Sequence, residues 1–442
     1  MSSVNLAGVR VVVVGLARSG VAAVELLVEK GARVTAVDQN AIPNARLSAR
    51  GIHVLAQAAE SFAGAELVVL SPGVPADLDL VQQARAKGAR VIGDLELASW
   101  FLQGDIAGIT GSNGKTTTTA LTGHILRESG IAAQVGGNIG TPPCSLVSSS
   151  RAGQWNVLEL SSFQLETTES FHARVGAALN VTADHLDRHY TMKNYAEMKG
   201  RLFRNQRNGD VAVLNTGDAF TRAYAAETPA SVLWFSSTSE VSPGAWVRDH
   251  EIILDGNTLM PTDEVPLQGA HNLENTMAAA LIARVAGASP AKIREAVKTF
   301  PGVEHRLEFV RSLSGVAWYN DSKATNVDAT LRAVAAFPGK LWVILGGKDK
   351  DTDYSPLGAP LKQKAHAALL IGAAAAKIED HLRGSVELVR CGTLAAAIEQ
   401  AHRRATAGDT VLLAPACSSF DQFENFEHRG REFKRLVGEL KS

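Results

Sequence analysis

The segment Thr110–Thr118 constrains the fold of this chain more than any other, because its residue order is typical of a loop that closes around phosphate. It reads Thr-Gly-Ser-Asn-Gly-Lys-Thr-Thr-Thr and lies between an apolar run that ends at Ile109 and a helix-like segment from Ala120. Glycines let backbone N–H groups face phosphate oxygens, the lysine adds a cation, and the next hydroxyl can reach Mg²⁺. Although Ile109 replaces the first glycine of the strict pattern, the segment predicts a strand, a phosphate loop and a helix.

Length and charge narrow the class of protein. The chain has 442 residues, 45% of them apolar, which predicts about three folded domains. Its net charge of −1 gives no electrostatic reason to expect nucleic acid or an anionic membrane as a partner. The three cysteines have no metal-binding spacing, and no apolar run is long enough to span a bilayer or act as a signal peptide. We therefore expect a cytoplasmic protein.

The first segment alternates strand and helix signals. An apolar run, Val9–Val14, leads into the turn Gly15–Gly20, a helix-patterned stretch follows, and a second apolar run ends at Asp38. The dinucleotide-binding pattern needs glycine where this chain has Ala17, so a different phosphorylated ligand is favoured over NAD(P). The turn Ser71–Pro75 follows a third apolar run, at a strand end where ligands bind in open α/β sheets.

The second segment carries acidic residues and histidines at strand ends. The run Trp155–Glu159 predicts a strand that ends in an acid, which makes Glu159 the candidate for holding Mg²⁺. Asn180–His189 places aspartates and two histidines after another strand. Zinc binding by His185 and His189 is less favoured than assistance to Mg²⁺ by His185, because no third ligand lies at a familiar spacing.

The third segment begins near Pro301-Gly302, where a helix-like stretch ends. Apolar runs at Leu341–Leu345, Ala368–Ile371 and Thr410–Ala414 alternate with helical patterns, which predicts another parallel α/β domain. The predicted fold class is therefore α/β with three domains. These are a Rossmann-like amino-terminal domain over 1–94, a central P-loop-type mononucleotide-binding ATPase domain over 95–302, and a Rossmann-like carboxyl-terminal domain over 303–442.

Several motifs in order give the chain a family resemblance. The phosphate loop is followed by Leu158–Glu166, Asn180–His189, His271–Asn275, Glu304–Arg306 and Asn320–Asn326. With these motifs the chain resembles the Mur ligase family over essentially its whole length. The stretch Ser418–Gly430, which reads Ser-Ser-Phe-Asp-Gln-Phe-Glu-Asn-Phe-Glu-His-Arg-Gly, is similar to the members that add D-glutamate.

The resemblance implies a reaction. ATP would phosphorylate the free carboxylate of UDP-N-acetylmuramoyl-L-alanine, and the amine of D-glutamate would attack the resulting acyl phosphate, releasing ADP and phosphate in peptidoglycan precursor synthesis. It also implies Mg²⁺, with two ions, and we expect a monomer without a nucleic-acid partner or membrane span. The handedness of the glutamate cannot be deduced from the sequence alone, and the resemblance supplies D-glutamate.

The resemblance also implies roles for individual residues. The catalytic set is Lys115, Glu159, His185, Lys199 and Lys323. The metal-binding set is Thr116, Glu159, His185 and Lys199, the last as a carbamate. The ATP-binding set is Gly111, Ser112, Asn113, Gly114, Lys115, Thr116, Thr117, Asn272, Asn275, Arg306 and Asp321. The substrate-binding set is Arg18, Ser19, Asp38, Ser71, Asn138, His185, Lys323, Thr325, Lys350, Ser419 and Phe426. By its residue type alone, Lys199 would be a solvated helix charge.

Two other classes of protein remain as alternatives. A ligase that adds amino acids to folate would keep the phosphate loop but need not have a uridine-binding first domain. A nucleotide-binding scaffold without catalysis would explain both glycine loops, but it would leave Glu159, His185 and Lys323 without a role. Contacts at Gln39, Asn40 and Lys348 stay unassigned, because family members vary there.

Overall fold

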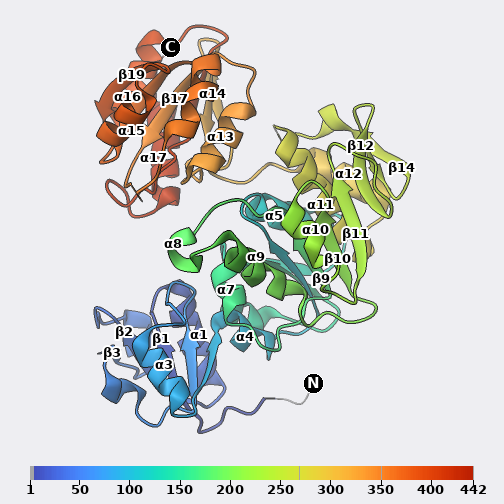
Figure 1. Ribbon diagram of the computed structural model, residues 1–442, viewed down its shortest axis with the longest axis vertical. Helices are drawn as coiled ribbons and strands as arrows, with labels where there is room; N and C mark the ends of the chain where they lie inside the picture. Colours follow the sequence, from blue (N-terminus) through green and yellow to red (C-terminus); the bar gives the residue numbers. More distant parts are fainter. Residues whose placement is uncertain (1–3, 268, 350, 442) are drawn as a thin grey trace. The chain divides into compact units, whose positions relative to one another are not determined.

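The computed structural model describes residues 4–267, 269–349 and 351–441 (Figure 1). The chain forms two compact units, Met1–Glu264 with Glu274–Phe300, and Val265–Leu273 with Pro301–Ser442. Unit 1 contains a five-stranded and a nine-stranded sheet, and unit 2 contains a six-stranded sheet. The predicted α/β class with three sheet-containing domains is confirmed. The exact boundaries at 94/95 and 302/303 stay a prediction.

The first sheet of unit 1 is fully parallel, in the order β3-β2-β1-β4-β5. Its strands are β1 (Arg10–Val14), β2 (Arg33–Asp38), β3 (Val54–Ala56), β4 (Leu67–Leu70) and β5 (Arg90–Gly93). The helices are α1 (Arg18–Glu29), α2 (Ala45–Ser48) and α3 (Asp79–Ala86). All four residues of β4 are buried, because α1 covers one face of the sheet and α3 the other. The predicted strand–turn–helix–strand unit is present.

The second sheet of unit 1 has the order β14-β13-β12-β11-β10-β9-β6-β8-β7. Its parallel strands are β6 (Asp105–Thr110), β7 (Ala133–Gly137), β8 (Trp155–Glu159), β9 (Val175–Ala178), β10 (Val211–Asn215), β11 (Ser231–Ser236) and β12 (Gly244–Arg248). Two antiparallel strands, β13 (Glu251–Leu254) and β14 (Asn257–Pro261), complete it. The strand order reverses at β6, between β8 and β9, and such a switch point is where open α/β sheets bind ligands.

Helices flank this second sheet and the junction with the first. They are α4 (Asp94–Ser99), α5 (Lys115–Glu128), α6 (Pro143–Leu146), α7 (Ser162–Glu166), α8 (Leu186–His189), α9 (Met192–Gly200), α10 (Ala219–Tyr224), α11 (Ala270–Val285) and α12 (Pro290–Thr299). Buried Glu96 on α4 accepts backbone N–H bonds from Glu169, Ser170 and Phe171, at 2.8 to 2.9 Å. This carboxylate therefore ties α4 to the segment that precedes β9.

Unit 2 has the sheet order β15-β16-β20-β17-β18-β19. The strands are β15 (Glu308–Leu313), β16 (Val316–Asn320), β17 (Leu341–Gly346), β18 (Ala365–Ile371), β19 (Glu387–Gly392) and β20 (Thr410–Leu413). Helices α13 (Val327–Ala335), α14 (Gly358–Lys364) and α15 (Ala375–Leu382) cover one face, and α16 (Leu394–Arg404) and α17 (Phe426–Glu439) the other. A purely parallel sheet was predicted, and this is wrong for one edge. There β15 pairs antiparallel with β16 through a tight turn.

Among the described residues, no helix combines the length and apolar character needed to cross a membrane.

A buried carboxyl group generates the first prediction. Asp94 is 1% exposed, and neither of its oxygens has a hydrogen bond among the described residues. Burial raises the pKa of Asp94 to about 6, although the nearby polar groups of Ser19 and Gln164 partly offset the shift. Between pH about 4 and about 6 the folded protein thus holds a proton that the unfolded chain has lost, so stability falls as pH rises.

We expect Asp94→Asn to remove this loss of stability, because asparagine carries no charge at any pH. Above pH 6 the variant should be more stable by roughly 1–3 kcal/mol, and the difference should vanish towards pH 4. Thermal unfolding measured from pH 4 to 8 tests this, with Asp79→Asn as the control because Asp79 lies exposed in the first turn of α3. An Asp94→Asn effect that is the same at every pH would contradict the prediction.

Candidate functional site

The phosphate loop leaves the carboxyl end of β6 and is held in shape by the loop after β9. Ser112 N and Asn113 N donate to Asn180, at 2.8 and 2.9 Å. Gly114 has φ +85°, and a Cβ there would lie 2.2 Å from Asn275 Oδ1, so only glycine fits. Helix α5 begins at Lys115, so its positive dipole end faces the loop. The loop is thus built to receive an anion.

Thr116, Glu159 and Asn138 come together beside this loop. Thr116 Oγ1 donates to Glu159 Oε2 at 2.7 Å, and Asn138 Nδ2 donates to Glu159 Oε1 at 3.0 Å. Glu159 is 2% exposed at the end of β8. Carboxylate and hydroxyl oxygens are the ligands that Mg²⁺ prefers, usually together with phosphate oxygens and water. Within the described ranges, no three His, Cys, Asp or Glu side chains cluster as a metal site.

Lys199 and Lys115 converge on one backbone carbonyl. Lys115 Nζ donates to Gly111 O at 2.7 Å, and Lys199 Nζ donates to the same oxygen at 2.8 Å. Lys199 is 1% exposed and lies 4.4 Å above the Tyr195 ring. Burial, and then the charge of Lys115, lower the pKa of Lys199 well below its usual value. The interpretation of Lys199 as a solvated helix charge, based on residue type alone, is therefore wrong.

His185 sits in a cluster of rings next to this lysine. Its ring lies 4.8 Å from Phe163 and 6.4 Å from Tyr195, and His189 stacks on Phe163 at 5.3 Å. His185 has φ +52°, which turns the chain sharply into α8. His189 Nε2 is 2.9 Å from Ser162 Oγ, and His185 Nε2 is 3.6 Å from Asp184 Oδ2. The cluster joins the Leu158–Glu166 and Asn180–His189 motifs.

Arg188 connects the His185 loop to two other elements of unit 1. Its Nη2 donates to Glu166 Oε2 at 2.7 Å and to Val74 O, in the turn after β4, at 3.3 Å. A cavity of about 420 Å³ opens beside these contacts. The turn after β4 was predicted to bind substrate, so Arg188 links that turn to the loop that carries His185.

The predicted residues of the first sheet gather around the glycine turn. Asp38 Oδ2 accepts from Leu16 N at 2.8 Å, and Ser71 Oγ donates to Gly15 O at 2.7 Å. Arg18 donates to Gly140 O, in the loop after β7, and Ser19 lies near buried Asp94. These contacts hold the turn at the carboxyl end of the sheet. Ligand contacts by these four residues stay a prediction.

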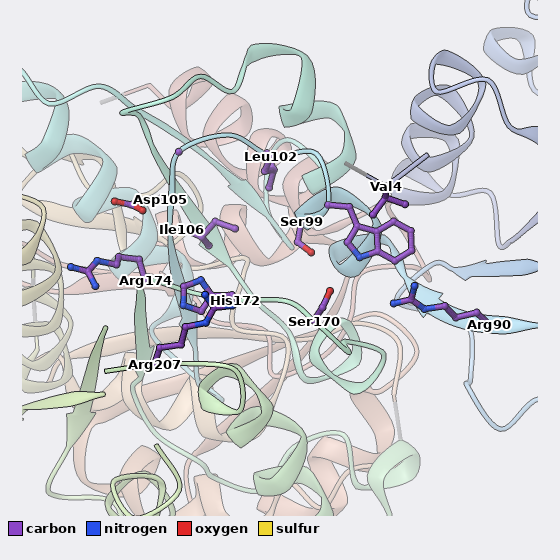
Figure 2. Close-up of a pocket in the computed structure, with 12 residues that line it drawn as sticks. Val4, Arg90, Ser99, Leu102, Asp105, Ile106, Ser170, His172, Arg174 and Arg207 are labelled. Atoms are coloured by element: carbon purple, nitrogen blue, oxygen red, sulfur yellow. The ribbon is translucent and has the colours of Figure 1, made fainter. Parts of the chain in front are cut away.

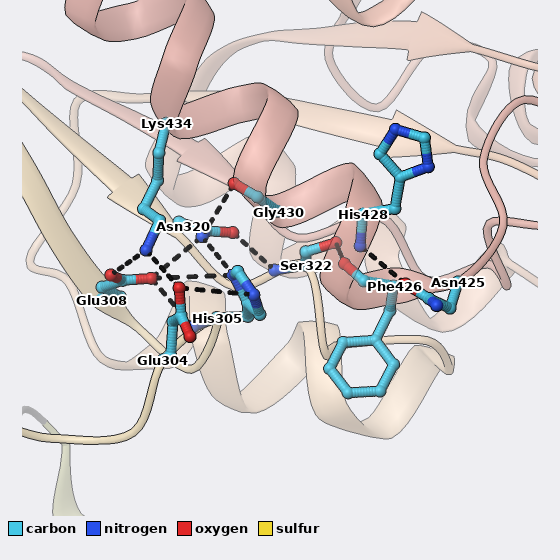
Figure 3. A network of polar contacts seen from close by, with 10 residues as sticks. All are labelled: Glu304, His305, Glu308, Asn320, Ser322, Asn425, Phe426, His428, Gly430 and Lys434. Atoms are coloured by element: carbon cyan, nitrogen blue, oxygen red, sulfur yellow. Dashed lines mark hydrogen bonds and ion pairs between the residues drawn. The ribbon is translucent and has the colours of Figure 1, made fainter. Parts of the chain in front are cut away.

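Unit 2 brings together a second group of predicted residues. Arg306 Nη1 lies 3.9 Å from Asp321 Oδ1, and burial raises the pKa of Asp321 to about 6 even though Arg306 opposes the shift. Lys323 N donates to His305 O at 3.1 Å, and Lys323 Nζ lies 4.9 Å from the Phe426 ring. Figure 3 shows Phe426 and His305 within one polar network.

For the remaining predicted residues of unit 2, only burial or position in the chain is described. Asn272 and Ser419 are buried, and Thr325 lies two residues after Lys323. Lys350 lies outside the described residues.

Three further residues, which the sequence patterns did not single out, shape these sites. Gln164 forms a capping box with Ser161 at the start of α7, and the order Ser-Ser-Phe-Gln was a usable signal. Asp94 and Arg429 are fully buried, but charged residues on amphipathic helices usually face solvent. Only the packing of neighbouring loops reveals them.

A separate cavity of about 400 Å³ lies at the amino end of β6, the opposite edge from the phosphate loop (Figure 2). Figure 2 shows His172 and Arg174 on one side and Arg90 on the other. Arg90 pairs with Glu169 at 2.7 Å, and both His172 and Arg174 pair with Asp210. The cavity is not part of the phosphate site, because it lies at the opposite end of β6.

Comparisons with family profiles cover most of the chain. Residues 9–93 match the profile described as Mur ligase MurD-like, N-terminal domain. Residues 109–283 match the Mur ligase middle domain, and residues 305–417 match the Mur ligase glutamate ligase domain.

The chain is similar to two curated proteins that share one name, UDP-N-acetylmuramoylalanine–D-glutamate ligase. The protein from Solibacter usitatus is 56% identical over 437 residues, 99% of each chain. The protein from Koribacter versatilis is 46% identical, over 99% of this chain and 98% of its own.

Solved structures share the fold at lower identity. UDP-N-acetylmuramate–alanine ligase from Thermotoga maritima is 19% identical, with a TM-score of 0.63 over 98% of this chain and 100% of its own. A pseudomurein peptide ligase from Methanothermus fervidus is also 19% identical, with a TM-score of 0.61 over the same shares. At such identities the likeness shows the fold alone.

The contacts of Arg188 generate the second prediction. Arg188→Ala removes the charge-assisted hydrogen bond to Glu166 and the hydrogen bond to the backbone of Val74. Together these two bonds stabilise the loop by about 1–2 kcal/mol. Amide hydrogen exchange in residues 184–191 should therefore become roughly tenfold faster, while exchange in α17 stays unchanged. Lys193→Ala is the matched control, because Lys193 is 84% exposed and its pairing with Glu197 is long. Unchanged exchange in this loop would contradict the prediction.

Proposed function

The chain belongs to the Mur ligase family, and from this premise we propose that it joins UDP-N-acetylmuramoyl-L-alanine to D-glutamate with hydrolysis of ATP to ADP and phosphate. The choice of substrates rests on one observation. Relatives that match this chain from end to end, at up to 56% identity, share the name of that ligase. The phosphate loop with its two converging lysines supports ATP as the source of energy.

The chemistry explains why the enzyme uses ATP. A carboxylate is a poor electrophile, so the γ-phosphoryl group is first moved to its oxygen, giving an acyl phosphate and ADP. The neutral amine of glutamate then attacks the acyl carbon, the nitrogen releases a proton, and phosphate leaves from the tetrahedral intermediate to give the amide. Phosphoryl transfer depends mainly on positioning and charge stabilisation. We assign the phosphates to Lys115 and the N–H groups at the start of α5, because a cation and a helix N-terminus favour an anion.

The metal proposal depends on the chemistry of the side chains that could act as donors. The Thr116 hydroxyl and the Glu159 carboxylate fit one Mg²⁺, because both offer hard oxygens beside the phosphate loop. His185 and a carbamate on Lys199 would hold a second ion. When bound, the ions neutralise charge on the phosphoryl group during its transfer. Asn138, bonded to Glu159, orients the carboxylate.

The carbamate on Lys199 requires a neutral amine. The nitrogen attacks CO₂, an N–C bond forms and one proton is released, so a neutral side chain becomes an anion. The lowered pKa of Lys199 supports this step, because burial and the charge of Lys115 both favour the neutral amine over the ammonium. The two oxygens of the carbamate would supply the hard donors that Mg²⁺ prefers, together with His185.

The other site residues complete the proposal. We assign the uridine diphosphate side to Arg18, Ser19, Asp38 and Ser71, with Asn138 reaching the sugar or diphosphate. ATP is assigned further to Asn272, Asn275, Arg306 and Asp321. Glutamate is assigned to Lys323, Thr325, Ser419 and Phe426, because a lysine cation suits a dicarboxylate. Lys350 belongs to this pocket by family resemblance only. The proposal includes a monomer that acts in the cytoplasm.

Phosphate release from the purified protein tests the function. We expect release only when ATP, Mg²⁺, UDP-N-acetylmuramoyl-L-alanine and D-glutamate are all present. Omission of any one component serves as the control, and L-glutamate tests the handedness of the pocket. Equal release with L-glutamate would overturn the stereochemistry, and no release in the full mixture would overturn the proposal.

Replacement of Lys199 tests the carbamate. Lys199→Ala should lower kcat by roughly 100-fold or more, because the metal loses a ligand. A short carboxylic acid such as acetate should restore part of the activity by filling the vacated space with two oxygens. Lys193→Ala, on the same helix but exposed, should behave like the unmodified enzyme. Full activity of Lys199→Ala without acetate would remove the carbamate from the proposal.

A further inference from the structure

Arg429, in the first turns of α17, is a buried cation with an unusual set of partners. Its side chain is 0% exposed, and its N–H groups reach only uncharged acceptors. Among the described residues no ion pair joins it to a carboxylate. Burial lowers the pKa of Arg429 to about 10, so the guanidinium is still charged at neutral pH. A buried charge is costly unless hydrogen bonds compensate it.

The acceptors lie on three separate loops. Arg429 Nε donates to Ser322 Oγ at 2.9 Å, and Nη2 donates to Ser322 O at 2.9 Å and Cys417 O at 3.1 Å. Longer contacts join Nη1 to Ser418 O at 3.4 Å and to Gly346 O at 3.5 Å. These acceptors follow or end β16, β20 and β17, which are neighbours in the sheet. One side chain therefore ties together the carboxyl ends of three adjacent strands.

Two of the three tied segments adjoin a residue of the proposed glutamate pocket. Ser322 precedes Lys323, and Ser418 precedes Ser419. Ser322 Oγ, which accepts from Arg429, donates in turn to Phe426 O at 2.9 Å, as Figure 3 shows. The chain of bonds thus runs from the guanidinium to the backbone of Phe426, whose ring lies 4.9 Å from Lys323 Nζ.

The loops pack closely around Arg429. Gly347 has φ +142°, and a Cβ there would lie 2.2 Å from Ser418 O and 3.1 Å from Arg429 Nη1. Lys348 N also donates to Ser418 O, at 2.9 Å. Because Arg429 is fully buried and its five N–H groups are directed at protein oxygens, it is not available to a ligand.

We propose that Arg429 is the positioning residue of the amino-acid pocket, which sets the spacing of Lys323, Ser419 and Phe426 by holding the ends of β16, β20 and β17. This inference rests on the proposed function, because it assigns those three residues to glutamate. A planar guanidinium with five donors can bond several carbonyls at fixed angles, whereas a lysine ammonium is a single point with three donors. Loss of Arg429 should therefore affect binding of the amino acid more than binding of nucleotide.

Arg429→Lys tests the proposal, with KM measured separately for each substrate. We expect KM for D-glutamate to rise by about tenfold or more, while KM for ATP and for UDP-N-acetylmuramoyl-L-alanine stays within about twofold. Arg435→Lys is the matched control, since Arg435 lies half exposed on the same helix and pairs with Glu432. A purely structural role would lower the active fraction and reduce kcat for all substrates without changing this one KM.

Ser322→Ala provides a second variant in case Arg429→Lys does not fold. It removes the hydroxyl between Arg429 and Phe426 but leaves the guanidinium and its other carbonyl partners in place. A selective rise in KM for D-glutamate, of about threefold or more, is expected. If neither soluble variant changes that KM selectively, the inference is wrong. If the unmodified enzyme releases no phosphate with D-glutamate, the proposed function is wrong instead.

Discussion

The parallel sheet is the constraint on which the candidate sites depend. Parallel strands bring their carboxyl ends to one edge, so loops far apart in sequence meet there. The phosphate loop follows β6, Glu159 ends β8, and Asn180 lies in the loop after β9, which is why these groups touch. Unit 2 repeats the arrangement with Ser322, Gly346 and Ser418 at the ends of β16, β17 and β20.

Lys199 and Arg429 differ in how the free-energy cost of burying a positive charge is reduced. Both are fully buried basic side chains without an ion pair to a carboxylate among the described residues. Desolvation disfavours the charged form of a lysine, so the pKa of Lys199 is lowered and the neutral amine that the proposed carbamate needs is favoured. Arginine keeps its charge, so Arg429 is compensated by carbonyl and hydroxyl oxygens and serves as a fixed link between loops. The residue type thus fits the two proposed roles, a chemical one for Lys199 and a positioning one for Arg429.

The local patterns of the chain were sufficient for most of the fold. The apolar runs before Gly15 and Thr110 form β1 and β6, and the phosphate loop ends at α5 as predicted. The antiparallel strands β13 and β14 and the pairing of β15 with β16 were missed, because short edge strands give a weak periodic signal. Lys199 on α9 was judged by residue type alone as solvated, since no local pattern reports that a loop from another strand covers it.

The sequence by itself determined the main alternation of strands and helices, the phosphate loop, and the motifs that identify the family. Those features are local, because glycine conformation and apolar periodicity act within a few residues. Only the tertiary structure decided which charged groups are buried and what they contact. The lowered pKa of Lys199, the raised pKa of Asp94 and the five contacts of Arg429 all arise from burial by segments distant in sequence. Desolvation depends on that packing, and no single stretch of residues determines the packing.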